Sequence, residues 1–443
     1  MAAAPIPTAG ALLSDTQRRR ASRLRWTSFS LLIVAYMLGY FHRMAPAVLS
    51  GDLQTAFHTS GAALGVLAAS YFYAYTLMQI PSGVLADIWG PRRSVTFGAL
   101  LAALGALAFG LAESLWIAGA GRFLIGLGAS MIFIAILKLV SNWFYEHQFA
   151  TVTGLTILLG NLGGLTAATP LSWSLEFASW RSIMVVLAAA SGALGLLVWL
   201  IVRDSPREMG LPSMRELEGR PAHAAYAGNW RSGLLEVLKN PATWPGFFVS
   251  MGLGGFFFTF AGLWAVPFLR DVQGFERGIA AHHGSLLLLG FAMGSMFLGF
   301  ISDRLGRRRP PMFGYLAAFG ACWAPVQLAL PLPTWLSLAL YFMIGFFATG
   351  YTITLTTTKE TNPPALSGMA TSVVNAGVFL GAAILQPLVG GIMDYGWDGR
   401  LVDGARLYSL SNYQCGFAAM SAFVLMAFLV ATRVRETYCR HTH

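Results

Sequence analysis

The chain has 443 residues, of which 56% are hydrophobic and only 11% are charged. A soluble domain carries roughly 25% charged residues, so this composition excludes an ordinary soluble protein and indicates a membrane protein. The net charge of +10 does not indicate a nucleic-acid partner, because the positive residues are sorted to one side of a membrane. The sequence has no nucleophile–base pair, phosphate-binding loop or paired cysteine spacing. We therefore expect no enzyme, no cofactor and no metal site.

Runs of about 20 apolar residues cross a bilayer as helices, and the chain contains twelve of them. The first run is too long for the core of a signal peptide, so we expect it to remain as a membrane span. The sequence therefore predicts an all-α membrane protein with twelve transmembrane helices. The runs lie near residues 26–48, 62–86, 94–112, 116–141, 149–172, 182–202, 243–268, 280–302, 312–330, 334–357, 366–392 and 412–432.

Lysine and arginine are distributed unevenly about these spans. Of the 29 such residues, 21 fall on the side that holds the N-terminus and five on the opposite side. Positive residues favour the cytoplasmic side, so both termini are predicted to be cytoplasmic. We expect an integral protein of the bacterial inner membrane, monomeric and surrounded by lipid. The other three basic residues fall inside spans, and of these Lys138 is close enough to the inner surface to reach it.

One loop sequence occurs twice in the chain. Gly83 to Arg93 follows the second span, and a copy from Gly299 to Arg309 follows the eighth span, 216 residues later. The chain is therefore predicted to be two halves of six spans each, as in one large class of transporters. The predicted segments are an N-terminal tail 1–25, a first half 26–202, a cytoplasmic linker 203–242, a second half 243–432 and a tail 433–443.

The repeated loop resembles that of the major facilitator superfamily, which reads roughly G-x-L-a-D-r-x-G-r-r. The stretch Gly121-Arg122 to Gly128 is similar to the R-x-x-x-G-x-G motif of its fourth helix. The resemblance covers essentially all the spans, although Ile88 and Pro91 depart from the loop pattern. It implies the major facilitator fold and a latch between the halves that breaks as the transporter changes state. The latch residues would be Gly83, Asp87, Gly90, Arg92, Arg93, Asp303, Gly306 and Arg307.

Two arginines inside spans form the expected substrate site. Arg43 lies 17 residues from Trp26, and Arg122 lies 19 residues from Ser141. At about 1.5 Å per helical residue, both are roughly 25–28 Å from the inner surface. A charge in hydrocarbon is costly and usually functional, and two guanidinium forks at one depth suit a carboxylate. The polar groups expected to add contacts to the substrate are Tyr40, Tyr75, Asn375 and Gln386.

The acidic residues indicate how transport is coupled. None of the 19 lies deep in a span, so the buried carboxylate that most proton symporters use is missing. The first and fourth spans resemble those of the anion:cation symporter branch, whose Tyr-x-x-Arg pattern is matched by Tyr40 and Arg43. That branch often has an acid just before the arginine and a glutamate in span four, where this chain has His42 and Ala129. Histidine titrates near neutral pH, so His42 is the candidate for proton coupling.

These features together predict a secondary active transporter that moves a small organic anion or zwitterion by alternating access. Its partners would be that small molecule, protons and the lipid bilayer. The string from Tyr40 to Leu53 also resembles carriers of intracellular bacteria, which gives amino acids, peptides or nucleosides as the second substrate class. An exporter of a metabolite or siderophore, and a receptor that binds ligand without transport, are further alternatives. Import or export, and coupling to protons, sodium or no ion, stay open at this point.

Overall fold

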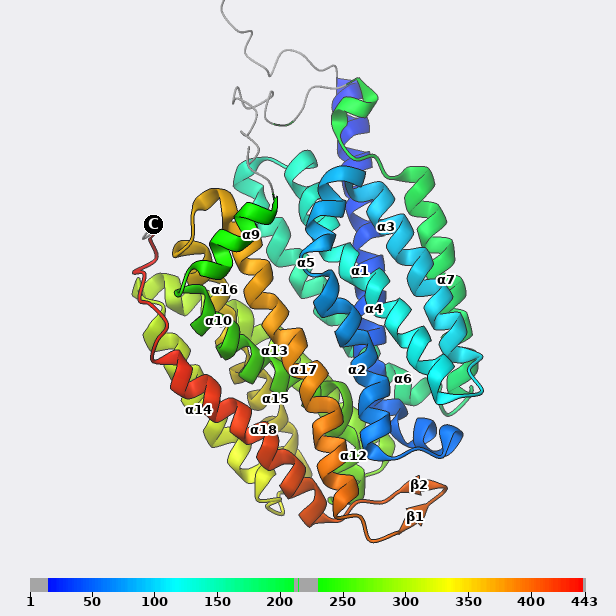
Figure 1. Cartoon of the computed structure of the whole chain (residues 1–443). Coiled ribbons are helices and arrows are strands. Elements are labelled where there is room, and N and C mark those ends of the chain that lie inside the picture. The colour runs from blue at the N-terminus through cyan, green and yellow to red at the C-terminus, as the bar shows by residue number, and fades with distance from the viewer. Residues whose placement is uncertain (1–14, 211–213, 215–229, 441–443) are drawn as a thin grey trace, which may run out of the picture.

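A computed structural model describes residues 15–210, 214 and 230–440 of the chain. Parts of the predicted tail 1–25, linker 203–242 and tail 433–443 lie outside the described residues. Figure 1 shows two bundles of long helices side by side, with both ends of the described chain at one end of the molecule. We call this end the inner end. The opposite, outer end carries a short antiparallel hairpin of β1 (Leu401–Val402) and β2 (Ala405–Arg406), in which Val402 is paired with Ala405.

The first bundle holds the helices that precede the linker. Three of them begin at a serine, Ser60, Ser114 or Ser179, whose hydroxyl accepts a hydrogen bond from a backbone N–H of the first turn, as N-cap serines do. The elements are α1 (Asp15–Phe57), α2 (Gly61–Met78), α3 (Pro81–Gly110), α4 (Leu115–Trp143), α5 (Glu146–Thr166), α6 (Thr169–Ser174), α7 (Trp180–Ile201) and the 3₁₀ turn η2 (Pro206–Met209).

The second bundle follows the linker helix α9 (Trp230–Lys239). Its first span is divided into five pieces by two π-helical segments, η3 and η4, and its fourth span contains a 3₁₀ turn, η5. The elements are α10 (Thr243–Val249), η3 (Ser250–Gly254), α11 (Gly255–Thr259), η4 (Phe260–Trp264), α12 (Ala265–Asp271), α13 (Arg277–Leu305), α14 (Arg309–Gln327), α15 (Thr334–Ala348), η5 (Thr349–Tyr351), α16 (Thr352–Glu360), η6 (Pro364–Leu366), α17 (Ser367–Tyr395) and α18 (Leu410–Ala431).

Eleven helical segments of the described chain are long and apolar enough to cross a membrane. The predicted run 312–330 coincides with α14, a helix of 19 residues that packs against α15 and α18. Arg309 and the three prolines of α14 lower its hydropathy without breaking the helix. The all-helical membrane fold predicted from the sequence is therefore confirmed. The ninth predicted span, α14, is present as a helix but is less apolar than the other eleven.

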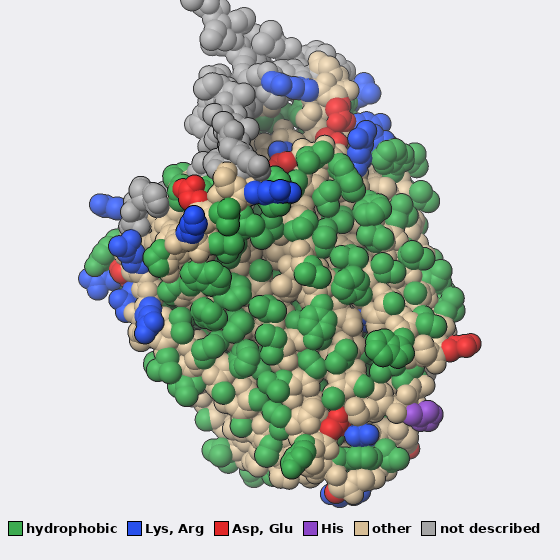
Figure 2. Space-filling view, viewed as in Figure 1, with side chains coloured by type: hydrophobic (Ala, Val, Ile, Leu, Met, Phe, Trp, Pro, Cys, Tyr) green, Lys and Arg blue, Asp and Glu red, His purple; other side chains and the backbone are tan. Residues whose placement is uncertain are grey.

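The surface that surrounds the helices is apolar midway between the inner and outer ends. Figure 2 shows hydrophobic side chains across this zone and lysine and arginine side chains gathered toward the inner end. Large apolar side chains are well exposed on the described surface, among them Leu77 at 66%, Val186 at 67% and Phe300 at 62%. A soluble monomer rarely exposes so much contiguous apolar surface, whereas lipid chains are a favourable solvent for it. The chain is an integral membrane protein with many helical spans.

The glycine of the repeated loop has a positive φ in both halves. Gly90, at the kink inside α3, has a φ of 78°, and Gly306, just after α13, has a φ of 62°. These two glycines are 216 residues apart, which is the offset between the two copies of the loop. Residues with a side chain rarely adopt a positive φ, so glycine is favoured at this position in both copies. The turns themselves differ, because ψ is 166° at Gly90 and 22° at Gly306.

The two bundles are joined most extensively through α2 and α17. Near the outer end, Gly65 of α2 lies directly on the backbone of Gln386 and Pro387 in α17. Further in, the rings of Tyr75 and Phe379 are 4.2 Å apart, and the side chain of Asn375 donates to Gln79. Because these contacts follow the length of both helices, α2 and α17 define the spacing between the two halves at the level of the site.

The close approach at Gly65 predicts a specific loss of stability. A Cβ at this position would be 2.6 Å from Cα of Pro387 and 2.8 Å from the carbonyl carbon of Gln386. Gly65→Ala should therefore force α2 and α17 apart and lower the unfolding temperature in detergent, since overpacking typically costs about 1–3 kcal/mol. Gly154→Ala in α5 is the matched control, because a Cβ there meets nothing within 4 Å. An unchanged melting temperature for Gly65→Ala would contradict this description of the interface.

Candidate functional site

Arg43 lies between the two halves and is enclosed by aromatic rings from both. Its side chain is 3% exposed, and its guanidinium carbon is within the cation–π range of about 6 Å of five ring centroids. We call Arg43 and these rings the Arg43 cluster. The first half contributes Tyr40 at 4.3 Å, Tyr71 at 5.5 Å and Tyr75 at 4.8 Å, and the second half contributes Phe258 at 5.3 Å and Phe379 at 5.1 Å.

The charge of Arg43 is held without an acidic partner. Its Nε donates to the hydroxyl of Tyr71 at 3.4 Å, and that hydroxyl donates to the carbonyl of Gly39 at 3.3 Å. Among the described residues, no carboxylate lies within ion-pair distance of Arg43. Ring faces stabilise the flat face of a guanidinium but do not replace a counter-ion. A buried charge in this condition is costly, so the cluster is suited to receive an anion.

Arg122 is equally buried but is directed elsewhere. Its Nη1 donates to the carbonyl of His42 at 2.6 Å, and its Nη2 donates to the carbonyl of Ala68 at 3.2 Å. Its guanidinium carbon is 5.5 Å from the ring of Tyr71, the same tyrosine that contacts Arg43. The structure thus brings both predicted arginines to Tyr71, while the terminal nitrogens of Arg122 tie α4 to α1 and α2.

His42 faces the interior of the first bundle rather than the Arg43 cluster. It is 2% exposed and lines a narrow internal gap between α1, α3, α4 and α7. Two polar atoms of the gap residues, Nε2 of His42 and Oγ of Ser191, are buried without a hydrogen-bond partner in the described chain. The other lining residues are apolar or glycine: Ala35, Leu38, Gly39, Ala99, Ala102, Ala129, Ile132 and Leu194.

Two predicted contact residues of α17 are engaged in hydrogen bonds. Asn375 donates through Nδ2 to Oε1 of Gln79 at 3.1 Å, across the interface between the halves. Gln386 donates through Nε2 to the carbonyl of Phe258 at 3.3 Å, and its Oε1 is buried without a partner among the described residues. Sequence reasoning missed Phe258, Phe379 and Tyr71 as members of the site. For Tyr71 a signal existed, since Tyr71 and Tyr75 share one helical face.

The outer ends of the two halves are bonded to each other. The carboxylate of Asp394, in α17, accepts hydrogen bonds from the backbone N–H groups of Gly61 at 2.9 Å and Ala62 at 2.7 Å, which begin α2. Such a carboxylate complements the positive end of the helix dipole. Arg277 pairs with Asp52 at 2.8 Å across the same boundary. The outer end is therefore closed in this structure.

At the inner end, the predicted latch residues form contacts within their own halves. Asp87 pairs with Lys138 at 2.7 Å, and its side chain is 69% exposed. Arg92 donates through Nε to the carbonyl of Trp199 at 2.7 Å, and its backbone N–H donates to Asp204 at 2.6 Å. Burial raises the pKa of Asp204, against the effect of that N–H. Gly90 adjoins the same carboxylate, and the charge of Arg93 also lowers the pKa of Asp204, whereas Gly83 has open space around it.

The second copy of the loop is bonded in a related way. Arg308 pairs with Asp303 and with Glu360, each at 2.7 Å. The carboxylate of Glu436 accepts from the backbone N–H groups of Arg308 at 2.8 Å and Arg309 at 2.9 Å. Asp204 and Glu436 each lie just beyond the last helix of their half, so each half has a carboxylate that receives the loop backbone. Sequence reasoning did not find either acid, and it named Arg307, which instead lies 6.0 Å from the ring of Tyr438.

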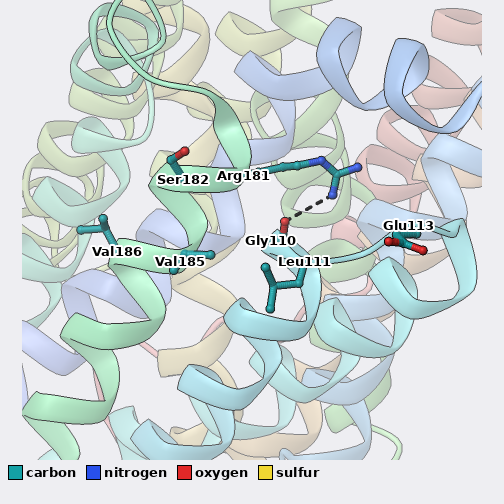
Figure 3. A pocket seen from close by; sticks show the side chains of 7 residues that line it. All are labelled: Gly110, Leu111, Glu113, Arg181, Ser182, Val185 and Val186. Atoms are coloured by element: carbon teal, nitrogen blue, oxygen red, sulfur yellow. Dashed lines mark hydrogen bonds between the residues drawn. The ribbon is translucent and has the colours of Figure 1, made fainter.

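A hollow at the outer surface is separate from these groups. Figure 3 shows Arg181 of α7 reaching toward the end of α3, where its Nη1 donates to the carbonyls of Gly110 and Ala112. An arginine at this position satisfies helix carbonyls that have no partner within the helix. Arg181 therefore stabilises the end of α3. Its lining residues are Gly110, Leu111, Glu113, Arg181, Ser182, Val185 and Val186.

A bundle of membrane-crossing helices in two repeated halves, with a buried cation where the halves meet, defines a secondary transporter. The chain belongs to the Major Facilitator Superfamily, whose family model matches residues 29–358 and 267–438. It is a transporter and not an enzyme. The resemblance predicted from the repeated loop and the fourth helix is thus confirmed.

The relatives of this chain include transporters of organic anions. It is 22% identical over 396 residues to a probable hexose phosphate transport protein of Chlamydia pneumoniae, with 84% of this chain and 86% of that protein covered. It is 24% identical over 335 residues to the hexuronate transporter of Escherichia coli strain K12, with 74% and 73% covered. These similarities are consistent with the predicted anion:cation symporter branch.

Solved structures share the fold. A bacterial homolog of the human lysosomal transporter Spinster, in an inward-facing and unoccupied conformation, matches with a TM-score of 0.71 at 18% identity. The match covers 94% of this chain and 96% of that chain. At this identity the likeness extends to the fold alone.

The carboxylate of Glu436 predicts a pH-dependent contribution to stability. Burial raises the pKa of Glu436, but the N–H groups of Arg308 and Arg309 outweigh this effect and hold the pKa below its ordinary value. A lowered pKa in the folded state stabilises the fold above about pH 4.3, and this stabilisation is lost as the pH falls through the folded-state pKa. Glu436→Gln should therefore lower the melting temperature at pH 7, and the difference from wild type should shrink below about pH 4.

Glu276→Gln is the control for this measurement. Glu276 is the N-cap residue of α13, yet its side chain makes no capping hydrogen bond. Its replacement should leave the melting temperature nearly unchanged across the same pH range. Equal effects of the two substitutions would mean that the bonds of Glu436 to the loop do not stabilise the protein.

Proposed function

We propose that this protein transports a small organic anion or zwitterion by alternating access, and that Arg43 binds its carboxylate or phosphate. The observation that supports this most directly is the buried charge of Arg43, held between the halves by rings and without an acidic partner among the described residues. A bound anion would be the counter-ion of Arg43 and could accept two hydrogen bonds from its guanidinium. Relatives named for hexose phosphate and hexuronate transport support the same class of substrate.

The other candidate residues differ in how directly they would contact the substrate. Tyr40 and Tyr75 lie against Arg43 and are placed to donate hydroxyl hydrogen bonds to a bound anion. Asn375 and Gln386 would contact the substrate after exchanging their present partners on α2 and α11. Arg122 acts as a positioning residue, because its fork holds the α1 backbone at His42, next to Arg43. In this proposal Arg43 alone therefore binds the substrate directly, whereas the sequence led us to expect that both arginines would.

The proposed cycle opens and closes the two ends of the bundle in turn. The closed outer end, with Asp394 on the start of α2, fits the half of the cycle in which substrate exchanges with the inner side. The exposed Asp87 and the contacts of Asp303 within its own half fit a latch that is disengaged in that state. We propose that the inner end is cytoplasmic in a bacterial inner membrane and that one copy of the chain suffices for transport.

We further propose that His42 carries a coupling proton. Protonation of His42 would add a positive charge beside Arg122, whose guanidinium is bonded to the His42 carbonyl. An anion bound at Arg43 offsets that charge, so anion and proton would favour each other's binding, and this coupling is reciprocal. Nε2 of His42 lies at the gap between α1, α3, α4 and α7 and has no hydrogen-bond partner among the described residues, so this nitrogen is the proposed proton acceptor.

Replacement of Arg43 tests the anion site. Arg43→Ala and Arg43→Lys should both reduce liposome uptake of glucose 6-phosphate, glucuronate or benzoate, whichever the wild type takes up. Loss of a buried charge pair typically costs 2–5 kcal/mol, so we expect a drop of at least about 30-fold for alanine. Arg181→Lys, at the outer surface, should transport normally. Normal uptake by Arg43→Ala would exclude the site, and Arg43-dependent binding without uptake would indicate a receptor.

Replacement of His42 tests the coupling ion. An inward proton gradient should stimulate uptake by the wild type, and His42→Gln should remove the stimulation while leaving exchange of substrate down its gradient. His283→Gln is the control, since His283 is also buried but has both ring nitrogens hydrogen-bonded, to Ile279 and Ser337. If His42→Gln still responds to the gradient, another group carries the proton. If the wild type does not respond, transport is uniport, exchange or sodium-coupled.

A further inference from the structure

We infer that the substrate of this transporter is an aromatic carboxylate, bound with its carboxylate on Arg43 and its ring against Phe258 and Phe379. The inference rests on the proposed binding of an anion by Arg43 and specifies the chemistry of the rest of that molecule. It follows from a difference between the two walls of the Arg43 cluster. One wall is rich in hydroxyl groups and the other consists of hydrocarbon rings.

The wall from the first half is suited to the charged end of a substrate. Tyr40, Tyr71 and Tyr75 surround the guanidinium, and the Tyr71 hydroxyl is already bonded to Nε of Arg43. Tyr36 extends this group, with its ring centroid 5.0 Å from that of Tyr40. Hydroxyl donors beside a guanidinium satisfy the remaining lone pairs of a carboxylate. The anionic group would therefore be held on this side.

The wall from the second half is suited to a flat apolar body. Phe258 and Phe379 are stacked, with centroids 5.9 Å apart and planes inclined by 30°. Behind Phe258 lies Phe291, which is stacked on Phe257 at 4.1 Å. Each ring is at most 5% exposed. Aromatic pairs separated by 4.5–7 Å gain energy beyond the area that they bury, so a substrate ring would be favoured among these side chains.

The same wall disfavours a sugar. A hexose phosphate or hexuronate has several hydroxyl groups, and each would need a hydrogen-bond partner once it is buried. Of the two α17 amides proposed to contact the substrate, Gln386 donates to the carbonyl of Phe258 and Asn375 donates to Gln79, and Oε1 of Gln386 is an acceptor without a partner among the described residues. One acceptor cannot pair the several hydroxyls of a sugar placed on Phe258 and Phe379, and those left unpaired are costly in a buried site. This wall is therefore poorly suited to a sugar.

The backbone at Phe258 gives the ring a way to move. Phe258 lies in α11, a piece of only five residues between the π-helical segments η3 and η4. π-Helical segments are rare and often lie at functional sites, where the extra residue lets the helix repack. A shift of α11 would separate Phe258 from Phe379 and admit a planar group between them. The broken first span of the second half thus acquires a role in substrate entry.

Binding to purified protein in nanodiscs, measured by calorimetry, tests this inference. The ligands are benzoate, phenylacetate, cyclohexanecarboxylate, glucuronate and glucose 6-phosphate. We expect an aromatic carboxylate to bind most tightly, with cyclohexanecarboxylate weaker because it is not planar. Phe258→Leu and Phe379→Leu should raise the Kd of the aromatic ligand about 3- to 10-fold, and Phe258→Tyr should retain affinity. Phe256→Leu is the control, since Phe256 packs on Phe319 and Trp323 instead.

The outcomes separate this inference from the function on which it rests. If glucuronate or glucose 6-phosphate binds more tightly than the aromatic acids, and Arg43→Ala abolishes that binding, the anion site stands and the aromatic class is wrong. If Phe258→Leu remains folded by its melting temperature and binds the aromatic ligand as well as wild type does, the assigned wall is wrong. If no ligand in the set depends on Arg43, the proposed anion site itself fails.

Discussion

The charge of Arg43 is the constraint on which the rest of the site depends. A guanidinium in the interior of a membrane protein must be stabilised, and here five aromatic rings surround it, with no carboxylate beside it among the described residues. An internal acid would neutralise the arginine permanently and would compete with any substrate anion. Rings stabilise the charge while leaving it uncompensated. They come from both halves, so the cluster is complete only while the halves are together, and this couples the site to their relative position.

The repeat explains how the two halves are stabilised separately. In each half, a carboxylate beyond the last helix accepts hydrogen bonds from the backbone of the repeated loop, Asp204 at Arg92 and Glu436 at Arg308 and Arg309. These bonds lie within one half and do not cross to the other. A half braced in this way can rotate as a unit, because its inner end is held together whether or not it touches its neighbour. The contacts that must break during transport are then confined to the interface.

Local signals in the sequence predicted much of this. Apolar runs define the spans because only a helix satisfies its backbone in lipid, and Arg43 and Arg122 were identifiable because charges are rare there. What surrounds them was not predictable. Phe258 and Phe379 reach Arg43 from positions more than 200 residues away, and one phenylalanine among 31 has no feature that marks it. The direction of the Arg122 fork likewise depends on which backbone carbonyls pack beside it, a tertiary property.

The position of Asp394 has a consequence for the protein at rest. This residue belongs to the second half, yet it completes the first turn of α2 in the other half. Loss of a helix cap typically costs about 0.5–2 kcal/mol, so separating the outer ends leaves α2 less stable until water replaces the carboxylate. Opening of the outer end therefore removes this contribution to the stability of α2. One carboxylate thus makes the folding of a helix in the first half depend on the position of the second half, and entry of substrate from the outer side requires α2 to give up this partner.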